Sequence, residues 1–307
     1  MNMPVLRSSL ATIALLGAWA LCAQDEAQQE LVTGTFAGTQ VVNAHSVEVV
    51  PRKRSFGFMI QHRFGTVGTD EQAWKQFAGL DLPANIRFSF LYAPFDHAQL
   101  ELGRSKNRKM WDLGAKFRVL KQTVEDEMPV SLTVLANAAL MSDDFPTVGD
   151  RDFFADGTTP FAYRFEHRLS YNAQFIVARR FDRWLSLQLA PVAIHRNLVA
   201  IGEPNLTLAL AVSGRFKVST KGSILVEVAP ILRGRRPDAH LEPLAIAYEV
   251  ATQGHVFQIV LSSGQEILEQ RAYTMPASRY DEGLFHLGFN IARTLLVKPK
   301  APKLPRP

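Results

Sequence analysis

A set of charged residues alternates with apolar residues in short segments spread along the chain. The set comprises Arg63, Arg87, Glu101, Asp112, Lys116, Arg118, Glu166, Arg168, Arg215, Lys217, Glu227 and Glu249. If these segments enclose an interior, the charges must pair with one another, with an inserted segment or with water. The even mixture of signs favours a salt-bridged, largely occluded interior over a narrow channel that prefers anions, and both interpretations stay open.

A second group of polar residues, His45, Ser46 and Glu48, precedes these segments. His45 and Glu48 would share a face of a helix but would point to opposite faces of an extended chain. Transition metals require three or four ligands, so this pair does not predict a metal site. We expect a docking role for these residues, and neither a metal nor another cofactor.

Two loop regions carry clustered charge of one sign. The acidic cluster consists of Asp143, Asp144, Asp150, Asp152 and Asp156. Its spacing fails the EF-hand rule, because Phe154 occupies a ligand position counted from Asp150, and a solvated loop is favoured. The basic cluster of Arg233, Arg235 and Arg236 suits lipid phosphates, although an ordinary charged loop is an equal alternative.

The candidates for catalysis are weak. His62, His167 and His255 would face outward, where a lipid-active enzyme would need a serine–histidine pair. No Gly-x-Ser-x-Gly motif is present, so we expect no enzyme and no catalytic residue. Nucleic-acid binding is not expected either, because the net charge of +5 is not gathered on one face with aromatic residues.

The first 23 residues are typical of a secretory signal peptide. Arg7 precedes a run of apolar or small residues from Leu10 to Leu21, which is too short to span a bilayer as a helix. Cleavage after Ala23 would remove Cys22, the only cysteine of the chain. Lipidation of Cys22 is the alternative, and it is disfavoured because Leu21 is not small.

The elements that would position the charged residues are strands, because the dominant pattern has a period of two. From Trp111 to Val119, for example, apolar residues alternate with Asp112, Gly114, Lys116 and Arg118. Twelve such segments are predicted, at 54–64, 83–92, 98–105, 110–120, 129–139, 167–180, 183–194, 205–217, 222–230, 244–251, 255–262 and 284–293. Their length, near ten residues, is what a tilted strand needs to cross a bilayer.

The lengths of the connections alternate along the chain. Links 65–82, 140–166, 195–204, 231–243 and 263–283 are long, whereas 93–97, 121–128, 181–182, 218–221 and 252–254 are short; only 106–109 departs from the rule. Long loops on one side and short turns on the other are typical of bacterial outer-membrane barrels. A soluble sandwich has no reason to segregate its loops in this way.

Several stretches resemble a family of predicted outer-membrane β-barrels of unknown function from Gram-negative envelopes. They are Leu31–Phe36, Val41–Glu48 with its His-Ser-Val-Glu motif, Ile60–Gly65 with His-Arg-Phe-Gly, and Gly288–Ile291. The resemblance implies a barrel with a periplasmic amino terminus, and it implies no activity. The sequence departs from such barrels at its end. They often end on an aromatic residue, whereas here the last strand continues through Arg293 and is followed by a ten-residue tail.

The sequence therefore predicts an all-β protein, a transmembrane antiparallel up-and-down β-barrel of about twelve strands in the outer membrane of a Gram-negative bacterium. Residues 24–53 would form a periplasmic segment or a lumen plug, residues 54–295 the barrel, and residues 296–307 a disordered tail. The expected function is that of a small-solute channel or an envelope scaffold. A lipid-active enzyme and a soluble periplasmic protein that binds an apolar ligand are the alternatives. Expected partners are outer-membrane lipid, the barrel-assembly machinery and small anionic solutes.

Overall fold

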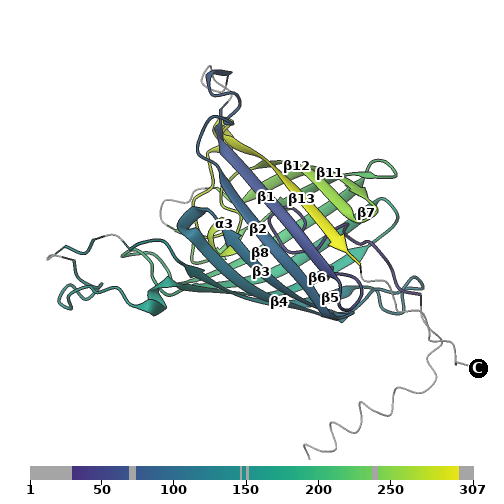
Figure 1. Cartoon of the computed structure of the whole chain (residues 1–307), viewed down its shortest axis with the longest axis horizontal. Coiled ribbons are helices and arrows are strands. Elements are labelled where there is room, and N and C mark those ends of the chain that lie inside the picture. The colour runs from purple at the N-terminus through teal and green to yellow at the C-terminus, as the bar shows by residue number, and fades with distance from the viewer. Residues whose placement is uncertain (1–29, 69–73, 146, 150–151, 237–240, 297–307) are drawn as a thin grey trace, which may run out of the picture.

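The computed structural model describes residues 30–68, 74–145, 147–149, 152–236 and 241–296, so the expected signal peptide and most of the expected tail lie outside the described residues. The described part is a β-barrel with a few short helical turns (Figure 1). Its strands are β1 (Phe56–Val67), β2 (Asn85–Phe95), β3 (Ala98–Ser105), β4 (Met110–Leu120), β5 (Ser131–Met141), β6 (Leu169–Arg180), β7 (Leu185–Arg196), β8 (Leu206–Lys217), β9 (Gly222–Val228), β10 (Ile231–Arg233), β11 (Leu244–Thr252), β12 (His255–Ser262) and β13 (Phe285–Leu295). Each predicted segment corresponds to a strand, with ends that differ by a few residues.

The sheet closes on itself by antiparallel pairing between neighbours in the chain. β1 pairs with β13 on one side, from Phe56 opposite Leu295, and with β2 on the other. β8 pairs with β9, and the three-residue β10 continues beyond Pro230 along the same edge of β8. Closure therefore involves twelve strands plus the short β10, and it leaves no strand edge unpaired along the circumference.

The two faces of the wall alternate as the sequence pattern predicts. In β6, Asn172, Gln174 and Ile176 are buried, whereas Tyr171 and Phe175 at alternate positions are exposed, the latter by 62%. The exposed outward side chains are mostly apolar and the buried inward ones mostly polar. This is the reverse of a water-soluble β-protein and is the arrangement of a barrel that faces lipid.

The connections separate by length at the two ends of the barrel. One end of the barrel, which we call the long-loop end, carries the described residues of links 68–84, 142–168, 197–205, 234–243 and 263–284, together with the short link 106–109. Links 96–97, 121–130, 181–184, 218–221 and 253–254 lie at the short-turn end. In the last of these turns Gly254 has a φ of +89°, a conformation that glycine adopts without steric cost.

Two parts of the chain enter the barrel and place buried residues in its interior. The first is residues 30–55, here called the inner segment, which precede β1. The second is residues 263–284, here called the inserted loop, which join β12 to β13 and contain the short helix α3 (Glu269–Ala272). Among the described residues, no helix is long and apolar enough to cross a membrane.

An apolar cluster joins the inner segment to one side of the interior. Phe36, Val41, Val42, Ala44 and Val47 of the segment are almost fully buried in it. Their partners on the wall are mostly small or branched side chains of β5 to β12. Burial of each larger side chain contributes about 1.5–3 kcal/mol, so this contact holds the segment in place.

Candidate functional site

The inner segment reverses direction inside the barrel through a tight turn. Gln40 and His45 form an isolated antiparallel bridge, and the N–H of Val41 donates to the carbonyl oxygen of Ala44 at 2.8 Å. The turn presents three successive N–H groups to one wall side chain. Oε2 of Glu227, on β9, accepts from Val42, Asn43 and Ala44 at 3.2, 3.1 and 2.9 Å. A carboxylate that accepts several backbone N–H groups is an effective anchor, because each such bond is charge-assisted.

Wall side chains from other strands donate to the carbonyl groups of the same segment. Nζ of Lys116, on β4, donates to the carbonyl oxygens of Thr39, Ser46 and Glu48 at 2.9, 2.7 and 2.7 Å. Further donors are Gln258 to Val41, Asn290 to Val42, Gln188 to His45 and Thr133 to Val47. Residues Gln188 and Gln99 also accept from the N–H groups of Val47 and Val50. The buried backbone of the segment is thus satisfied by the wall rather than by water.

The three polar residues of the His-Ser-Val-Glu motif, His45, Ser46 and Glu48, lie within this segment. Oγ of Ser46 donates to the carbonyl oxygen of Gly38 at 2.6 Å, and Oε1 of Glu48 accepts from the N–H of Thr35 at 3.0 Å. Oε2 of Glu48 also lies 3.9 Å from Nη1 of Arg118. The motif is not helical, and among the described residues no group of three or more potential metal ligands is present. Ser46 and Glu48 thus hydrogen-bond to other parts of the inner segment.

The inserted loop meets the inner segment at Glu269. Oε1 of Glu269 accepts from the N–H of His45 at 3.0 Å, and Oε2 accepts from Asn172 and Gln174 of β6 at 2.7 and 2.6 Å. The neighbouring Gln270 donates to Asn137 of β5. Burial raises the pKa of Glu269 to about 7, although the bond from His45 opposes this shift. Burial also holds the pKa of the His45 ring well below its ordinary value, so the ring is neutral.

A network of buried charges lies on the neighbouring strands β2 to β4, where Nδ2 of Asn137 also donates to Asp112 at 3.3 Å. The guanidinium of Arg87 donates to Asp112 at 2.6 Å and to Glu101 at 2.8 Å, and its Nη1 donates to Gln61 at 3.1 Å. Arg63, fully buried on β1, donates to Asn43 of the inner segment at 2.7 Å and to Asn290 of β13 at 2.9 Å. The buried ions are thus either paired or hydrogen-bonded, as a low-dielectric interior requires.

The remaining charged candidates divide into two groups. Arg118, Arg215 and Lys217 are half-buried near the short-turn end, and Arg215 pairs with the buried Glu249 at 3.0 Å. The structure corrects the placement of Glu166 and Arg168, which lie in a 3-10 turn (Phe165–Arg168) ahead of β6 and not on the wall. Nδ1 of His167 accepts from the N–H of Arg164 and closes this turn, so that the strand starts only at Leu169.

Sequence reasoning missed the uncharged polar residues of the interior and the inserted loop. Gln61, Gln99, Gln188, Asn137 and Asn290 are buried and contact the inner segment or the charge network. Their inward position follows from the same period-two alternation that places the charged residues on the inner face. The sequence pattern could therefore have identified them. Glu269 lies in a loop expected to be external, and no periodicity marks it.

The basic cluster of Arg233, Arg235 and Arg236 partly pairs with carboxylates of the chain. Arg236 pairs with Glu203 at 2.8 Å, and Arg235 contacts Glu242. Arg233, at the end of β10, is exposed. Two of the three lipid-phosphate candidates therefore contact carboxylates of the chain itself.

Comparison with known protein families shows to which family the chain belongs. The model of a family described as "Membrane bound beta barrel domain (DUF5777)" matches residues 36–295, which include the inner segment from Phe36 and every strand. The chain belongs to this family. No curated protein matches the sequence at a significant level.

Solved structures with a similar chain path include three channels. The NanC porin is 6% identical with a TM-score of 0.47, over 78% of this chain and 100% of that chain. The KdgM porin is 6% identical with a TM-score of 0.43, over 78% and 99%. The COG4313 outer membrane channel from Pseudomonas putida F1 is 12% identical with a TM-score of 0.46, over 81% and 98%. That the barrel of the present chain closes with twelve strands is shown by the pairing of its own strands.

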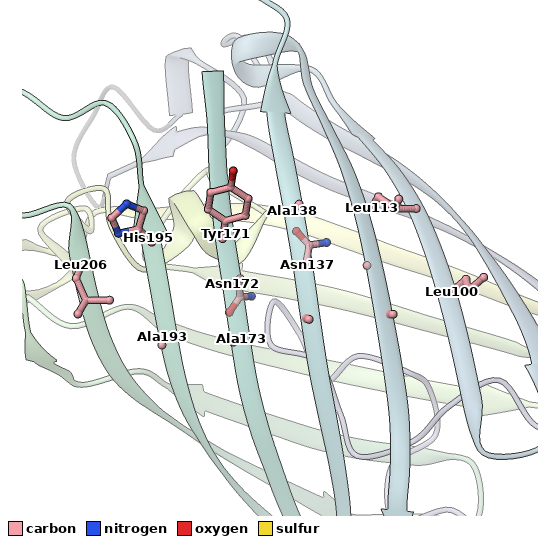
Figure 2. A pocket seen from close by; sticks show the side chains of 13 residues that line it. Leu100, Leu113, Asn137, Ala138, Tyr171, Asn172, Ala173, Ala193, His195 and Leu206 are labelled. Atoms are coloured by element: carbon pink, nitrogen blue, oxygen red, sulfur yellow. The ribbon is translucent and has the colours of Figure 1, made fainter. Parts of the chain in front are cut away.

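Family membership makes the outer wall of the barrel a membrane-facing surface. Figure 2 shows a hollow on this wall, about 660 Å³ in volume, where alanines of β4 to β7 lie between larger side chains. Tyr171 and His195 border it near the long-loop ends of β6 and β7. Its apolar lining suits lipid chains, and the expected soluble alternative is inconsistent with a membrane-bound family.

One serine–histidine contact occurs among the described residues. Oγ of Ser278, in the inserted loop, lies 2.9 Å from Nε2 of His286, and Nδ1 of His286 lies 3.0 Å from the carbonyl oxygen of Phe64. His286 is buried on the inner face of β13, away from the lipid-facing wall. His62, by contrast, stacks on Phe289 on the outer side. The contact ties the inserted loop to the wall.

Proposed function

We propose that this membrane-bound barrel is an outer-membrane channel that its own chain holds closed, and that it has no catalytic activity. The inner segment enters from the short-turn end and the inserted loop from the long-loop end. Together they form a plug. The observation that carries the proposal is the polar character of the wall around this plug: glutamine, asparagine, glutamate and lysine side chains from most strands point inward.

The chemistry of the wall favours a channel over a permanent scaffold. Inward side chains such as Gln188, Gln258 and Asn290 bind backbone groups of the plug where water would otherwise bind. The same side chains can be hydrated when the plug leaves, because amide groups exchange a protein partner for water at little net cost. Apolar burial of Val41, Val42 and Val47 opposes release, which makes the closed state the resting one.

Small anionic solutes are the proposed cargo. Among the strand residues that face the interior or its short-turn mouth, the cations Arg63, Arg87, Lys116, Arg118, Arg215 and Lys217 outnumber the acids Glu101, Asp112, Glu227 and Glu249. A modest excess of fixed positive charge attracts anions into a pore. A signal peptide at residues 1–23, assembly by the barrel-assembly machinery and periplasmic termini complete this proposal.

Planar-bilayer recording tests the channel. We expect the mature full chain to show little current and a chain without residues 24–53 to show steady single-channel steps with a reversal potential that indicates anion preference. Heat-modifiable gel mobility, in which a folded barrel migrates differently before and after boiling, controls for folding of both proteins. A shortened chain that folds but conducts no ions would refute the channel and favour a scaffold.

A separate assay addresses catalysis. We expect neither the full chain nor the shortened chain to hydrolyse phospholipid in mixed micelles. Turnover that disappears in Ser278→Ala or His286→Ala, but persists in His62→Ala, would assign activity to the buried serine–histidine contact. Such a result would overturn the non-enzymatic proposal.

A further inference from the structure

A basic pocket lies at the short-turn end, between the inner segment and the wall. It has a volume of about 410 Å³. Its floor includes Gly34 and Phe36 of the inner segment, and its sides are the ends of β6 and β8 with the turns that follow them. Five cations line it: Arg180, Arg183, Arg215, Lys217 and Lys221.

The pocket holds little compensating negative charge. Among its described lining residues no carboxylate is present. Glu249 accepts from Nε of Arg215 at 3.0 Å and thereby offsets one of the five cations. The carboxylate of Asp182 caps the adjacent turn by accepting the N–H of Leu185 at 2.8 Å. Five cations therefore share a cavity whose described lining contains no carboxylate, and one of them, Arg215, pairs with Glu249 outside that lining.

The arginines are held in place by contacts that leave N–H groups available. Nη1 of Arg180 donates to the carbonyl oxygen of Thr33 at 2.7 Å, and Nη1 of Arg215 donates to that of Gly34 at 3.3 Å. The guanidinium of Arg183 lies over the ring of Trp184, 4.8 Å from its centroid. A guanidinium has five N–H donors, so each arginine keeps free donors for a ligand.

Like charges that line one cavity repel, and an anion of more than one charge offsets this repulsion while accepting several charge-assisted hydrogen bonds. Phosphate groups meet this description, because their oxygens match arginine forks and lysine ammonium groups alike. We propose that the basic pocket binds a phosphate-bearing anion, either a soluble phosphate compound or the headgroup of an anionic phospholipid in the adjoining leaflet. This site is independent of whether the barrel conducts ions.

Calorimetry on the folded full chain in detergent tests the soluble source, with inorganic pyrophosphate as the probe at low salt. We expect the double variant Lys217→Gln, Lys221→Gln to bind pyrophosphate roughly tenfold or more weakly, because each substitution removes a charged donor. Arg164→Gln combined with Arg108→Gln is the matched control, because both residues are exposed at the long-loop end and the same charge is removed. The control should bind like the parent chain, and heat-modifiable mobility should be unchanged in both.

Native mass spectrometry tests the lipid source. The full chain and both double variants are extracted from vesicles of phosphatidylglycerol and of phosphatidylcholine, and retained lipid is counted. Pyrophosphate binding that depends on Lys217 and Lys221 supports a soluble ligand. Retention of phosphatidylglycerol with the same dependence supports a lipid headgroup. Absence of both, or equal binding by the lysine variant and the control, overturns the proposal.

Discussion

The backbone N–H of His45 donates to Oε1 of Glu269, with 3.0 Å between nitrogen and oxygen, although 224 positions separate the two residues. His45 enters from the short-turn end and Glu269 from the long-loop end. This bond therefore joins the two halves of the plug in the middle of the barrel. Because Glu269 also accepts from Asn172 and Gln174, one carboxylate connects both halves to the wall.

Replacement of Glu269 by alanine should loosen the plug. The change leaves the donors of His45, Asn172 and Gln174 without their acceptor in a buried place, at a cost of about 3 kcal/mol. We expect a lower temperature for the loss of heat-modifiable mobility and more frequent current openings. Glu282→Ala, an exposed carboxylate of the same loop, is the control and should change neither property. Equal behaviour of the two variants would contradict the role given to Glu269.

The stability of the plug should depend on pH through Glu269. Burial raises the pKa of this carboxyl from 4.5 to about 7. A pKa raised on folding contributes stability that is fully present below pH 4.5 and is lost as the pH rises towards 7. The neutral His45 acts in the opposite sense, because its lowered pKa contributes stability that is present above pH 6.5 and is lost as the pH falls.

Glu269→Gln separates these two contributions. As the pH rises from 4.5 to 7, the thermal midpoint of the parent chain should fall relative to that of this variant, because glutamine does not titrate. The comparison is repeated in a His45→Gln background, because the His45 ring lies 3.8 Å from Oε2 of Glu269 and the titrations of the two groups are therefore coupled. Thermal midpoints measured at several pH values in this window check the expectation, and parallel curves would disprove it.

Lys116 should control the mobility of the inner segment. Its ammonium donates to three carbonyl groups, those of Thr39, Ser46 and Glu48, and methionine preserves the unbranched stem without a donor. In Lys116→Met we expect faster amide hydrogen exchange at residues 39–50, while the wall strands stay protected. Lys121→Met, at the nearby end of β4, serves as the control. Unchanged exchange in the segment would show that the apolar cluster alone holds it.

The Arg87 network should be sensitive to loss of its cation. Arg87→Met leaves Asp112 and Glu101 buried without their partner, which costs about 3–5 kcal/mol. Urea titration of the folded barrel in detergent measures this loss. Adding Asp112→Asn and Glu101→Gln to the same chain should restore most of the stability, because uncharged amides tolerate burial better. A triple variant as unstable as the single one would contradict the pairing.

Outward apolar residues should tolerate charge poorly in lipid. Phe175, near the middle of β6, is 62% exposed, and its replacement by arginine should cost about 2–4 kcal/mol in vesicles. Val124→Arg is the control, because this residue is 54% exposed but lies in the link 121–130 at the short-turn end. Folding yields into vesicles check the comparison. Equal yields would contradict a lipid-facing wall at Phe175.

The strands and their inward faces follow from the sequence by itself. Period-two alternation, as in Trp111–Val119, is local, and the backbone geometry of a strand converts it directly into two faces. The short links then favour antiparallel pairing of neighbouring strands, and a lipid surrounding requires the sheet to close. The inward positions of Arg87, Asp112 and Lys116 could therefore be predicted, whereas the turn at Glu166 and Arg168 was misplaced because its cap depends on His167.

Only the tertiary structure decided what fills the barrel. The anchors of the inner segment are contacts such as Ala44 with Glu227 and Val47 with Gln188, whose partners lie far apart in the chain. No pattern of hydrophobicity marks them, because they join backbone groups, which every residue carries, to side chains on distant strands. The inward course of the inserted loop and the convergence of five cations on one pocket have the same origin: barrel closure brings distant segments together, and local sequence does not encode their distances.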